Sequence, residues 1–212
     1  MTVPSPVPSP DRVPAEDHAP AVPVTVYLAR HGRTALNAAG VLRGRLDPPL
    51  DDEGEAEAQR LARALAGAGI GAILSSPLRR ALQTASAVAA AAGLHVEVAD
   101  GLADRDYGDW AGHRSDELAD RFGSVDAAPG VEPEPEVRRR ALAVLDAVVA
   151  QHQAAPVLLV AHDAVNQLLL RALDPTLGPP GPRQRTGCFN KLERRDGRWR
   201  VLLVDMVGDS PG

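Results

Sequence analysis

The chain has 212 residues, of which 44% are hydrophobic and 24% are charged, and its formal net charge is −5. This composition is typical of one globular domain with its own core and argues against a largely disordered chain. Aromatic residues make up only 3% of the chain, so stacking platforms for single-stranded nucleic acid are not expected. The negative net charge also excludes a general basic field for nucleic acid, and any anion site must therefore be local.

The first 23 residues are rich in proline and lack the basic start and apolar core of a signal peptide. We expect a disordered tail over residues 1–23, a folded domain over 24–207 and a short C-terminal tail over 208–212. No apolar run approaches the ~18 residues of a membrane-spanning helix. The single cysteine, Cys188, excludes an intramolecular disulfide and is interpreted as an ordinary strand residue. The sequence thus predicts a cytoplasmic protein with no membrane or nucleic-acid partner.

Strand and helix patterns alternate along the predicted domain. Short apolar runs predict strands, and apolar residues at helical spacing predict the helices between them. In chain order we expect a strand at 24–29, a helix within 51–69, a strand at 71–75, a helix at 79–93, a strand at 95–99, an irregular stretch, a helix at 135–151, a strand at 156–161, a helix at 164–173 and a hairpin over 188–206. Asp196-Gly197 is the expected hairpin turn. This alternation predicts a three-layer α/β/α fold with a mainly parallel central sheet.

Charged side chains follow three of the predicted strands, within five residues of the end of each strand. These residues are Arg30 and His31, Arg79 and Arg80, and His162 and Asp163. Because the carboxyl ends of parallel strands meet at one edge of a sheet, we expect the side chains to converge there. Clustered histidines and arginines repel one another unless an anion lies between them, and arginine forks match phosphate oxygens. The sequence therefore predicts a phosphate site at this edge.

The same cluster predicts nucleophilic chemistry. Guanidinium groups near an imidazole favour its neutral form, which is the form that can attack phosphorus. The leaving alkoxide then needs a proton, and the segment "LADRDYGDWAG" (102–112) offers carboxyl groups for this purpose. We take Asp104 as the candidate donor and Asp106 as the alternative.

Four segments together resemble the histidine phosphatase superfamily, which has the phosphoglycerate mutase-like fold. They are "ARHGRTALN" (29–37), "SSPLRRALQTA" (75–85), "LADRDYGDWAG" (102–112) and "VLLVAH" (157–162), in the family's order and spacing. The resemblance covers about 24–192. It implies a phosphohistidine intermediate on His31, with no metal and no other cofactor. It also implies a proton donor at Asp104 and a set of groups that bind the transferring phosphoryl group, namely Arg30, Arg80, His162, Asn37 and Gly44.

Three positions depart from the pattern of this family. Many relatives carry Glu at the position of Asp104, so the shorter donor must sit closer to the leaving oxygen or act through water. Val41 stands where many relatives have a phosphate-binding Arg, which predicts a lost contact. Asp163 replaces the usual Gly and places a carboxylate near the pocket. Two roles are open for Asp163: it could orient His162, or it could recognise a hydroxyl or amine of the substrate.

Four further residues are candidates for substrate contact: Arg33, Asp106, Tyr107 and Asp163. A plain surface role is the alternative for Arg33, and packing is the alternative for Tyr107. We expect Arg79 to be a solvated neighbour of Arg80.

The sequence predicts a metal-independent phosphatase that hydrolyses phosphomonoesters of small metabolites, with such a metabolite or inorganic phosphate as its ligand. A phosphoglycerate mutase is one alternative, but mutases of this family carry a longer basic insertion where residues 112–134 are short and largely acidic or neutral. A metal-dependent phosphohydrolase built on His162 and Asp163 and a catalytically dead phosphate-binding module are the others. The hairpin edge is compatible with a dimer, and the sequence does not fix the oligomeric state.

Overall fold

The computed structural model describes residues 23–208, so the two expected tails lie outside the described residues except at Pro23 and Gly208. A six-stranded sheet with the order β3-β2-β4-β1-β5-β6 forms its centre. The strands are β1 (Val24–Arg30), β2 (Ala72–Ser75), β3 (Val96–Val98), β4 (Val157–Ala161), β5 (Phe189–Arg195) and β6 (Arg198–Met206). The first four strands pair in parallel, and the hairpin β5–β6 adds to β1 in antiparallel fashion.

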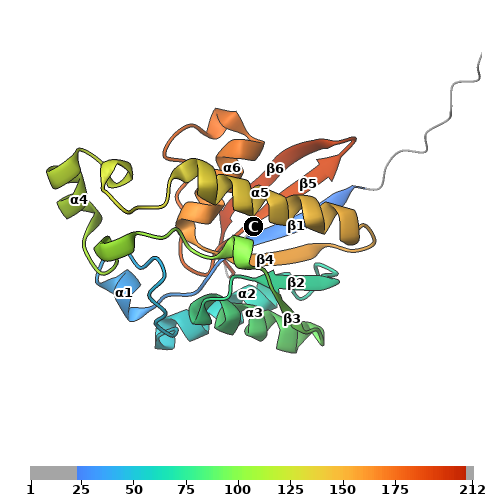
Figure 1. Cartoon of the computed structure of the whole chain (residues 1–212). Helices are drawn as coiled ribbons and strands as arrows, with labels where there is room; N and C mark the ends of the chain where they lie inside the picture. Colours follow the sequence, from blue (N-terminus) through green and yellow to red (C-terminus); the bar gives the residue numbers. More distant parts are fainter. Residues whose placement is uncertain (1–22, 209–212) are drawn as a thin grey trace, which may run out of the picture.

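Helices cover both faces of this sheet (Figure 1). They are α1 (Ala35–Ala38), α2 (Asp52–Leu65), α3 (Arg79–Ala92), α4 (Ser115–Phe122), α5 (Glu134–Gln151) and α6 (Asp163–Leu173). Helices α2 and α3 lie on one face and α5 and α6 on the other, while α1 and α4 lie beyond one end of the sheet (Figure 1). The expected three-layer α/β/α fold with a mainly parallel sheet is confirmed.

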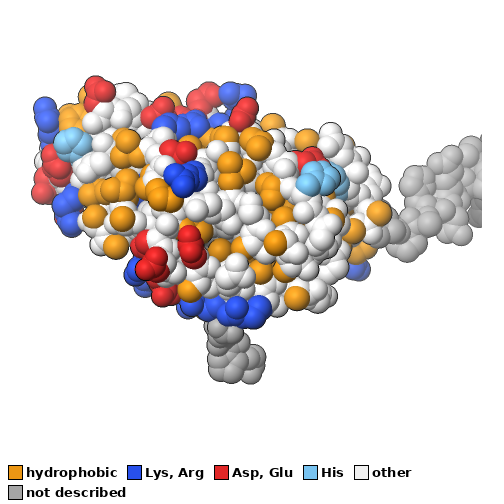
Figure 2. All heavy atoms as spheres, turned by 90° about the horizontal axis from the view of Figure 1, so that it is seen from below, with side chains coloured by type: hydrophobic (Ala, Val, Ile, Leu, Met, Phe, Trp, Pro, Cys, Tyr) orange, Lys and Arg blue, Asp and Glu red, His pale blue; other side chains and the backbone are white. Residues whose placement is uncertain are grey.

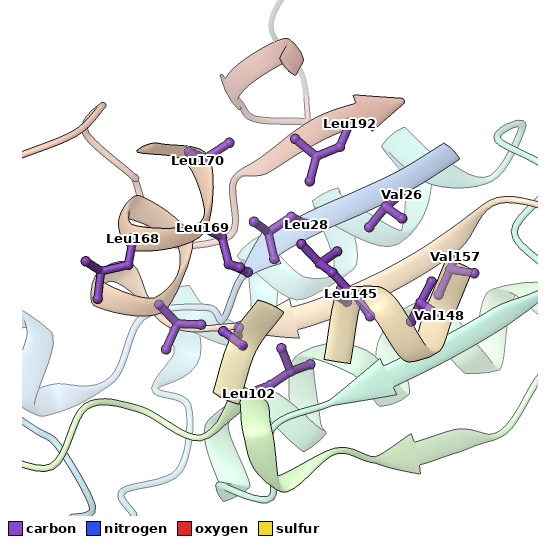
Figure 3. Packing of buried hydrophobic residues seen from close by; sticks show 14 of the residues in the cluster. Val26, Leu28, Leu102, Leu145, Val148, Val157, Leu168, Leu169, Leu170 and Leu192 are labelled. Atoms are coloured by element: carbon purple, nitrogen blue, oxygen red, sulfur yellow. The ribbon is translucent and has the colours of Figure 1, made fainter. Parts of the chain in front are cut away.

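Strand β1 contributes side chains to two hydrophobic cores, because alternate side chains of a strand point to opposite faces of the sheet. Val26 and Leu28 pack with Leu145 and Leu169 under α5 and α6 (Figure 3). On the other face Tyr27 and Ala29 pack with residues of α2 and α3. Figure 2 shows the outer surface of α2 and α3, where charged side chains gather in separate groups among apolar and small ones. No helix within 23–208 is long and apolar enough to cross a membrane.

Two helices were not expected from the sequence, and both depend on local capping. Helix α1 has only four residues and begins with a capping box, in which the side chains of Thr34 and Asn37 bond each other's backbone. Helix α4 ends at Gly123 in the left-handed conformation. The hairpin turn lies at Asp196-Gly197 as predicted, with φ values of 50° and 75°.

A contact between two glycines sets the distance between the end of β1 and helix α2. A Cβ on Gly54 would lie 2.0 Å from the carbonyl oxygen of Arg33, and a Cβ on Gly32 would lie 2.4 Å from the carbonyl oxygen of Gly54. Asp51 fixes the same junction, since its backbone N–H donates to Arg33 O and its side chain accepts from Gly54 N. The segment that follows β1 therefore rests directly on the first turn of α2.

We predict that Gly54→Ala lowers the free energy of unfolding by about 1–2 kcal/mol, because overpacking against backbone outweighs the gain of about 1 kcal/mol in helix propensity. Chemical or thermal unfolding measures the change. Gly67→Ala is the control, since a Cβ there meets nothing within 4 Å. A Gly54→Ala protein as stable as wild type would contradict the steric argument.

Candidate active site

The sheet topology brings three strand ends together. Strand β4 lies between β1 and β2, so the residues that follow these strands are neighbours. Arg30 is paired with Ala161, which places His31 and His162 at the same level beyond the sheet. Their rings are 5.0 Å apart between centroids. The predicted convergence of the two histidines is therefore present.

His31 is fully buried, and hydrogen bonds fix its tautomer. Its Nδ1 lies 2.6 Å from the carbonyl oxygen of Gly32, which can only accept, so Nδ1 carries the proton. Its Nε2 lies 3.2 Å from Nε of Arg80, which can only donate, so Nε2 presents its lone pair. Burial lowers the pKa of His31 well below its usual range, and the nearby His162, Arg80 and Arg30 lower it further. The imidazole is thus neutral, and the lone pair at its Nε2 accepts a hydrogen bond from Arg80.

Arg80 lies in the first turn of helix α3 and is also fully buried. Besides the bond to His31, its Nη1 donates to Leu46 O (2.8 Å) and its Nη2 donates to Gly44 O (3.1 Å). Nη2 also forms an ion pair of 2.9 Å with Oδ2 of Asp104, whose side chain is 4% exposed. One guanidinium therefore joins the nucleophile candidate to the candidate acid.

His162 faces the same space from the end of β4 and is fully buried. Its Nε2 lies 2.7 Å from the hydroxyl of Ser76, and its Nδ1 lies 3.7 Å from Oδ2 of Asp104 without a hydrogen bond to any described residue. Ser76 Oγ accepts from Leu78 N, which leaves its hydroxyl proton for Nε2 of His162. Burial and the charge of Arg80 lower the pKa of His162 well below its usual range. We infer a neutral ring whose Nδ1–H points toward Asp104.

Two further guanidiniums complete the cluster. Arg30 is 8% exposed, donates to Gln184 O and lies 3.7 Å from Asp163. Arg43 is largely buried, which lowers its pKa, and its nearest charges include Asp104 and Arg30. The Nε atoms of both arginines are buried without a hydrogen-bond partner among residues 23–208. Unpaired buried donors of this kind are suited to an anionic ligand.

A cavity of about 570 Å³ opens beside this cluster, and its wall includes five of the eleven predicted site residues, namely Arg30, Asn37, Asp104, Tyr107 and Asp163. The fully buried His31, Arg80 and His162 do not line it. Val41 offers no guanidinium to the cavity, as the sequence indicates, and Arg43 brings one to the same wall two residues later. In the sequence, Arg43 could have been recognised as a candidate phosphate ligand because it lies in the same loop as Val41.

The loop that carries Asp104 is held by Arg140 of helix α5. Nη1 of Arg140 donates to Gly101 O (2.9 Å) and Ala103 O (2.5 Å), and Nη2 donates to Asp104 O (3.1 Å). Nε and Nη2 of Arg140 also donate to the two carboxylate oxygens of Glu132. Partial burial opposes ionisation of Glu132, but these bonds and one from the Asp106 N–H hold its pKa below its usual range.

The remaining predicted residues have more local contacts. Asn37 Oδ1 accepts from Thr34, which leaves its amide NH₂ for the cavity. Gly44 contributes a carbonyl group to Arg80, and Asp106 accepts from the N–H of Gly108 within its own turn. Arg33 is paired with Asp51.

Asp163, Tyr107 and Cys188 can also be placed. Asp163 accepts from Gln167 and lies against Arg30, and His162 is bonded by Ser76 instead. Burial raises the pKa of the Tyr107 hydroxyl and of the Cys188 thiol, so neither is an anion at neutral pH. Arg79 is exposed, as expected. Within residues 23–208, no three His, Cys, Asp or Glu side chains are grouped so that they could hold a metal ion.

Known proteins share both the sequence pattern and the fold. A Bacillus subtilis protein named uncharacterized phosphatase PhoE is 30% identical over 83% of this chain and 91% of its own. A Salmonella paratyphi B protein named probable phosphoglycerate mutase GpmB is 28% identical over 87% of this chain and 92% of its own. The structure of the mycobacterial glucosyl-3-phosphoglycerate phosphatase Rv2419c in complex with VO3 superimposes with a TM-score of 0.76 at 27% identity, covering 86% of this chain and 98% of that one.

The family assignment follows from these similarities and from the extent of one match. Residues 26–206, which include all six strands except the start of β1, match the family model of the histidine phosphatase superfamily, branch 1. The chain belongs to the histidine phosphatase superfamily.

Proposed function

We propose that this protein is a metal-independent phosphatase that hydrolyses small phosphomonoesters through a phosphohistidine on His31. The observation that carries the proposal is the state of His31: a neutral imidazole with a fixed tautomer, whose Nε2 lone pair points at the buried guanidinium of Arg80. A neutral ring nitrogen is a nucleophile, and a guanidinium beside it stabilises the oxygens of a phosphoryl group as charge develops.

The first step forms a bond between Nε2 of His31 and phosphorus and breaks the bond between phosphorus and the ester oxygen. The electron pair of the broken bond goes to the leaving oxygen, which takes a proton from Asp104. In the second step water attacks the phosphohistidine, Asp104 takes a proton from that water, and the electron pair returns to Nε2. The products are an alcohol and inorganic phosphate, and the enzyme returns to its starting state.

Asp104 is placed for this role better than Asp106. Its carboxylate lies next to Arg80 and His162, whereas Asp106 is bonded to the backbone of its own turn. A phosphate dianion that enters beside Asp104 favours uptake of a proton by the carboxylate, because two neighbouring anions repel. The same dianion competes for the donors of Arg80, which frees the carboxyl group to face the leaving oxygen.

The phosphoryl oxygens have a set of donors around Nε2 of His31. Arg30 and Arg43 each offer a buried Nε without a partner, and His162 offers Nδ1. Asn37 offers its amide, and Gly44 acts indirectly by fixing Arg80. These groups can balance a dianion without a bound metal.

A small phosphorylated metabolite fits the open cavity, whose volume is about 570 Å³. The phosphatase names of PhoE and Rv2419c and the VO3 ligand of the latter support hydrolysis of a phosphate ester. The name of GpmB keeps phosphoglycerate mutase as the second candidate. Against it stands the short segment between Gly112 and Glu134, which contains two basic residues besides His113.

The direct test is hydrolysis of p-nitrophenyl phosphate with EDTA present, wild type beside His31→Ala. We expect wild-type activity to survive EDTA, and we expect His31→Ala to lose about 10⁴-fold or more in kcat. Because the pKa of His31 is lowered, the nucleophile stays neutral and activity is retained at pH 6. Loss of activity in EDTA would show that the reaction needs a metal, and full activity of His31→Ala would exclude the phosphohistidine route.

The role of Asp104 predicts a dependence on the leaving group. Asp104→Asn cannot donate the proton, so kcat/KM should fall about 100-fold or more for an alkyl phosphate. The fall should be much smaller for p-nitrophenyl phosphate, whose leaving group needs little protonation. Asp106→Asn is the matched control and should change neither substrate more than about threefold. Equal losses with both substrates in Asp104→Asn would argue against proton donation.

Arg140 is predicted to be a positioning residue for Asp104. In Arg140→Met the loop of residues 101–104 loses its three carbonyl contacts, and kcat should fall by about 10- to 100-fold. The inhibition constant for inorganic phosphate should change little, because the phosphoryl donors remain. Arg139→Met removes a neighbouring exposed guanidinium from the same helix and should keep wild-type kcat. Equal weakening of phosphate binding and kcat in Arg140→Met would indicate a general structural role instead.

A further inference from the structure

A second cavity, of about 460 Å³, adjoins the active site and is rich in arginine, although four of its five arginines, all except Arg183, are each ion-paired with a carboxylate. Five of its lining residues are arginines and one is a carboxylate: Arg30, Arg33, Arg60, Arg183, Arg185 and Glu57. We call this cavity the basic pocket. It lies where helix α2 meets the segment that leads into β5, and it shares Arg30 with the cluster around His31.

The basic pocket contains guanidinium donors that its one lining carboxylate, Glu57, does not bind. Both carboxylate oxygens of Glu57 are occupied, one by Arg33 N (2.7 Å) and the other by the hydroxyl of Thr186 (2.7 Å). Arg33 uses only its Nε in the pair with Asp51. Arg183 is exposed and has no ion pair or side-chain hydrogen bond among residues 23–208. The guanidinium of Arg183 and the Nη atoms of Arg33 are therefore available to an anion.

Two residues connect the basic pocket with the active-site cavity. Arg30 and Asn37 line both of them. Arg30 reaches from the carbonyl of Gln184, in the wall of the basic pocket, to Asp163, in the wall of the active-site cavity. One molecule that extends past Arg30 and Asn37 can therefore place groups in both cavities.

The wall of the basic pocket is also fixed relative to the nucleophile. Gly187 N donates to the carbonyl oxygen of His31 at 3.1 Å. Gly187 has φ of +67°, and a Cβ there would lie 2.7 Å from Cβ of Glu57, so this segment rests tightly on α2. A group bound in the basic pocket would thus be held at a set distance from Nε2 of His31.

We propose that the basic pocket is a second anion subsite, which binds the non-reacting anionic group of a doubly charged substrate. The proposal rests on the phosphatase function proposed above. The preferred substrate is then a phosphomonoester that carries a carboxylate or a second phosphate. Arginine forks match both groups, and the open setting of Arg183 allows for either.

The test compares matched substrates of increasing length. The probes are alkanediol bisphosphates, ω-phosphooxy carboxylates and simple alkyl phosphates with two to six carbons. At the length that spans the two cavities, wild type should give a kcat/KM at least about tenfold higher for one doubly anionic compound than for the alkyl phosphate of the same length, the scale of one charge-assisted hydrogen bond. The carboxylate and bisphosphate arms show which anion the subsite takes. For bisphosphates, a factor of two in kcat/KM is expected without any subsite, because either phosphate can react.

Arg183→Met should bring this ratio close to one, while Arg138→Met, an exposed arginine on α5, should keep the wild-type ratio. A wild-type enzyme that hydrolyses alkyl phosphates with a ratio near one at every length would overturn the subsite and leave the phosphatase function intact. A high ratio that persists in Arg183→Met would also overturn it. A wild-type protein that hydrolyses none of the compounds would overturn the function and the subsite together.

Discussion

Burying a guanidinium away from water is costly unless its donors are engaged and its charge is paired. Arg80 meets this condition by contacts with three separate segments: His31 after β1, the loop carbonyls of Gly44 and Leu46, and Asp104. If any of these segments moved away, the buried guanidinium of Arg80 would lose a hydrogen-bond partner or its paired charge. The arrangement of the proposed nucleophile, His31, and the proposed acid, Asp104, is therefore a condition for burying Arg80 stably.

The same arrangement keeps two histidines uncharged. Burial is the largest cause of the lowered pKa of both His31 and His162, and the arginines add to it. A site with this balance has donors and a nucleophile ready before a ligand enters, so little reorganisation is needed at the moment of reaction. Asp104 lies between these groups, 2.9 Å from Nη2 of Arg80 and 3.7 Å from Nδ1 of His162.

The fold and the centre of the site could be predicted because both depend on local patterns. Continuous apolar runs and helical spacing gave the layers, and the rule that loops meet at the carboxyl ends of strands brought His31, Arg80 and His162 together. Contacts between segments far apart in sequence were not accessible in this way. Ser76 on His162, Arg140 on the Asp104 loop and Gln184 on Arg30 depend on side-chain directions that only the folded chain defines. Helix α4 was missed because its eight residues carry only one fully buried side chain, Leu118.

The hairpin β5–β6 lies beyond β1, on the side of the sheet away from β2 and β4. The segment that enters this hairpin reaches the mouth of the site without taking part in the parallel β–α units that place the two histidines. The part of the segment before Gln184 can therefore change in length and composition, while Gln184 and Gly187 keep their contacts with Arg30 and His31. In evolution, such a segment offers a route to new substrates that leaves the machinery of phosphoryl transfer undisturbed.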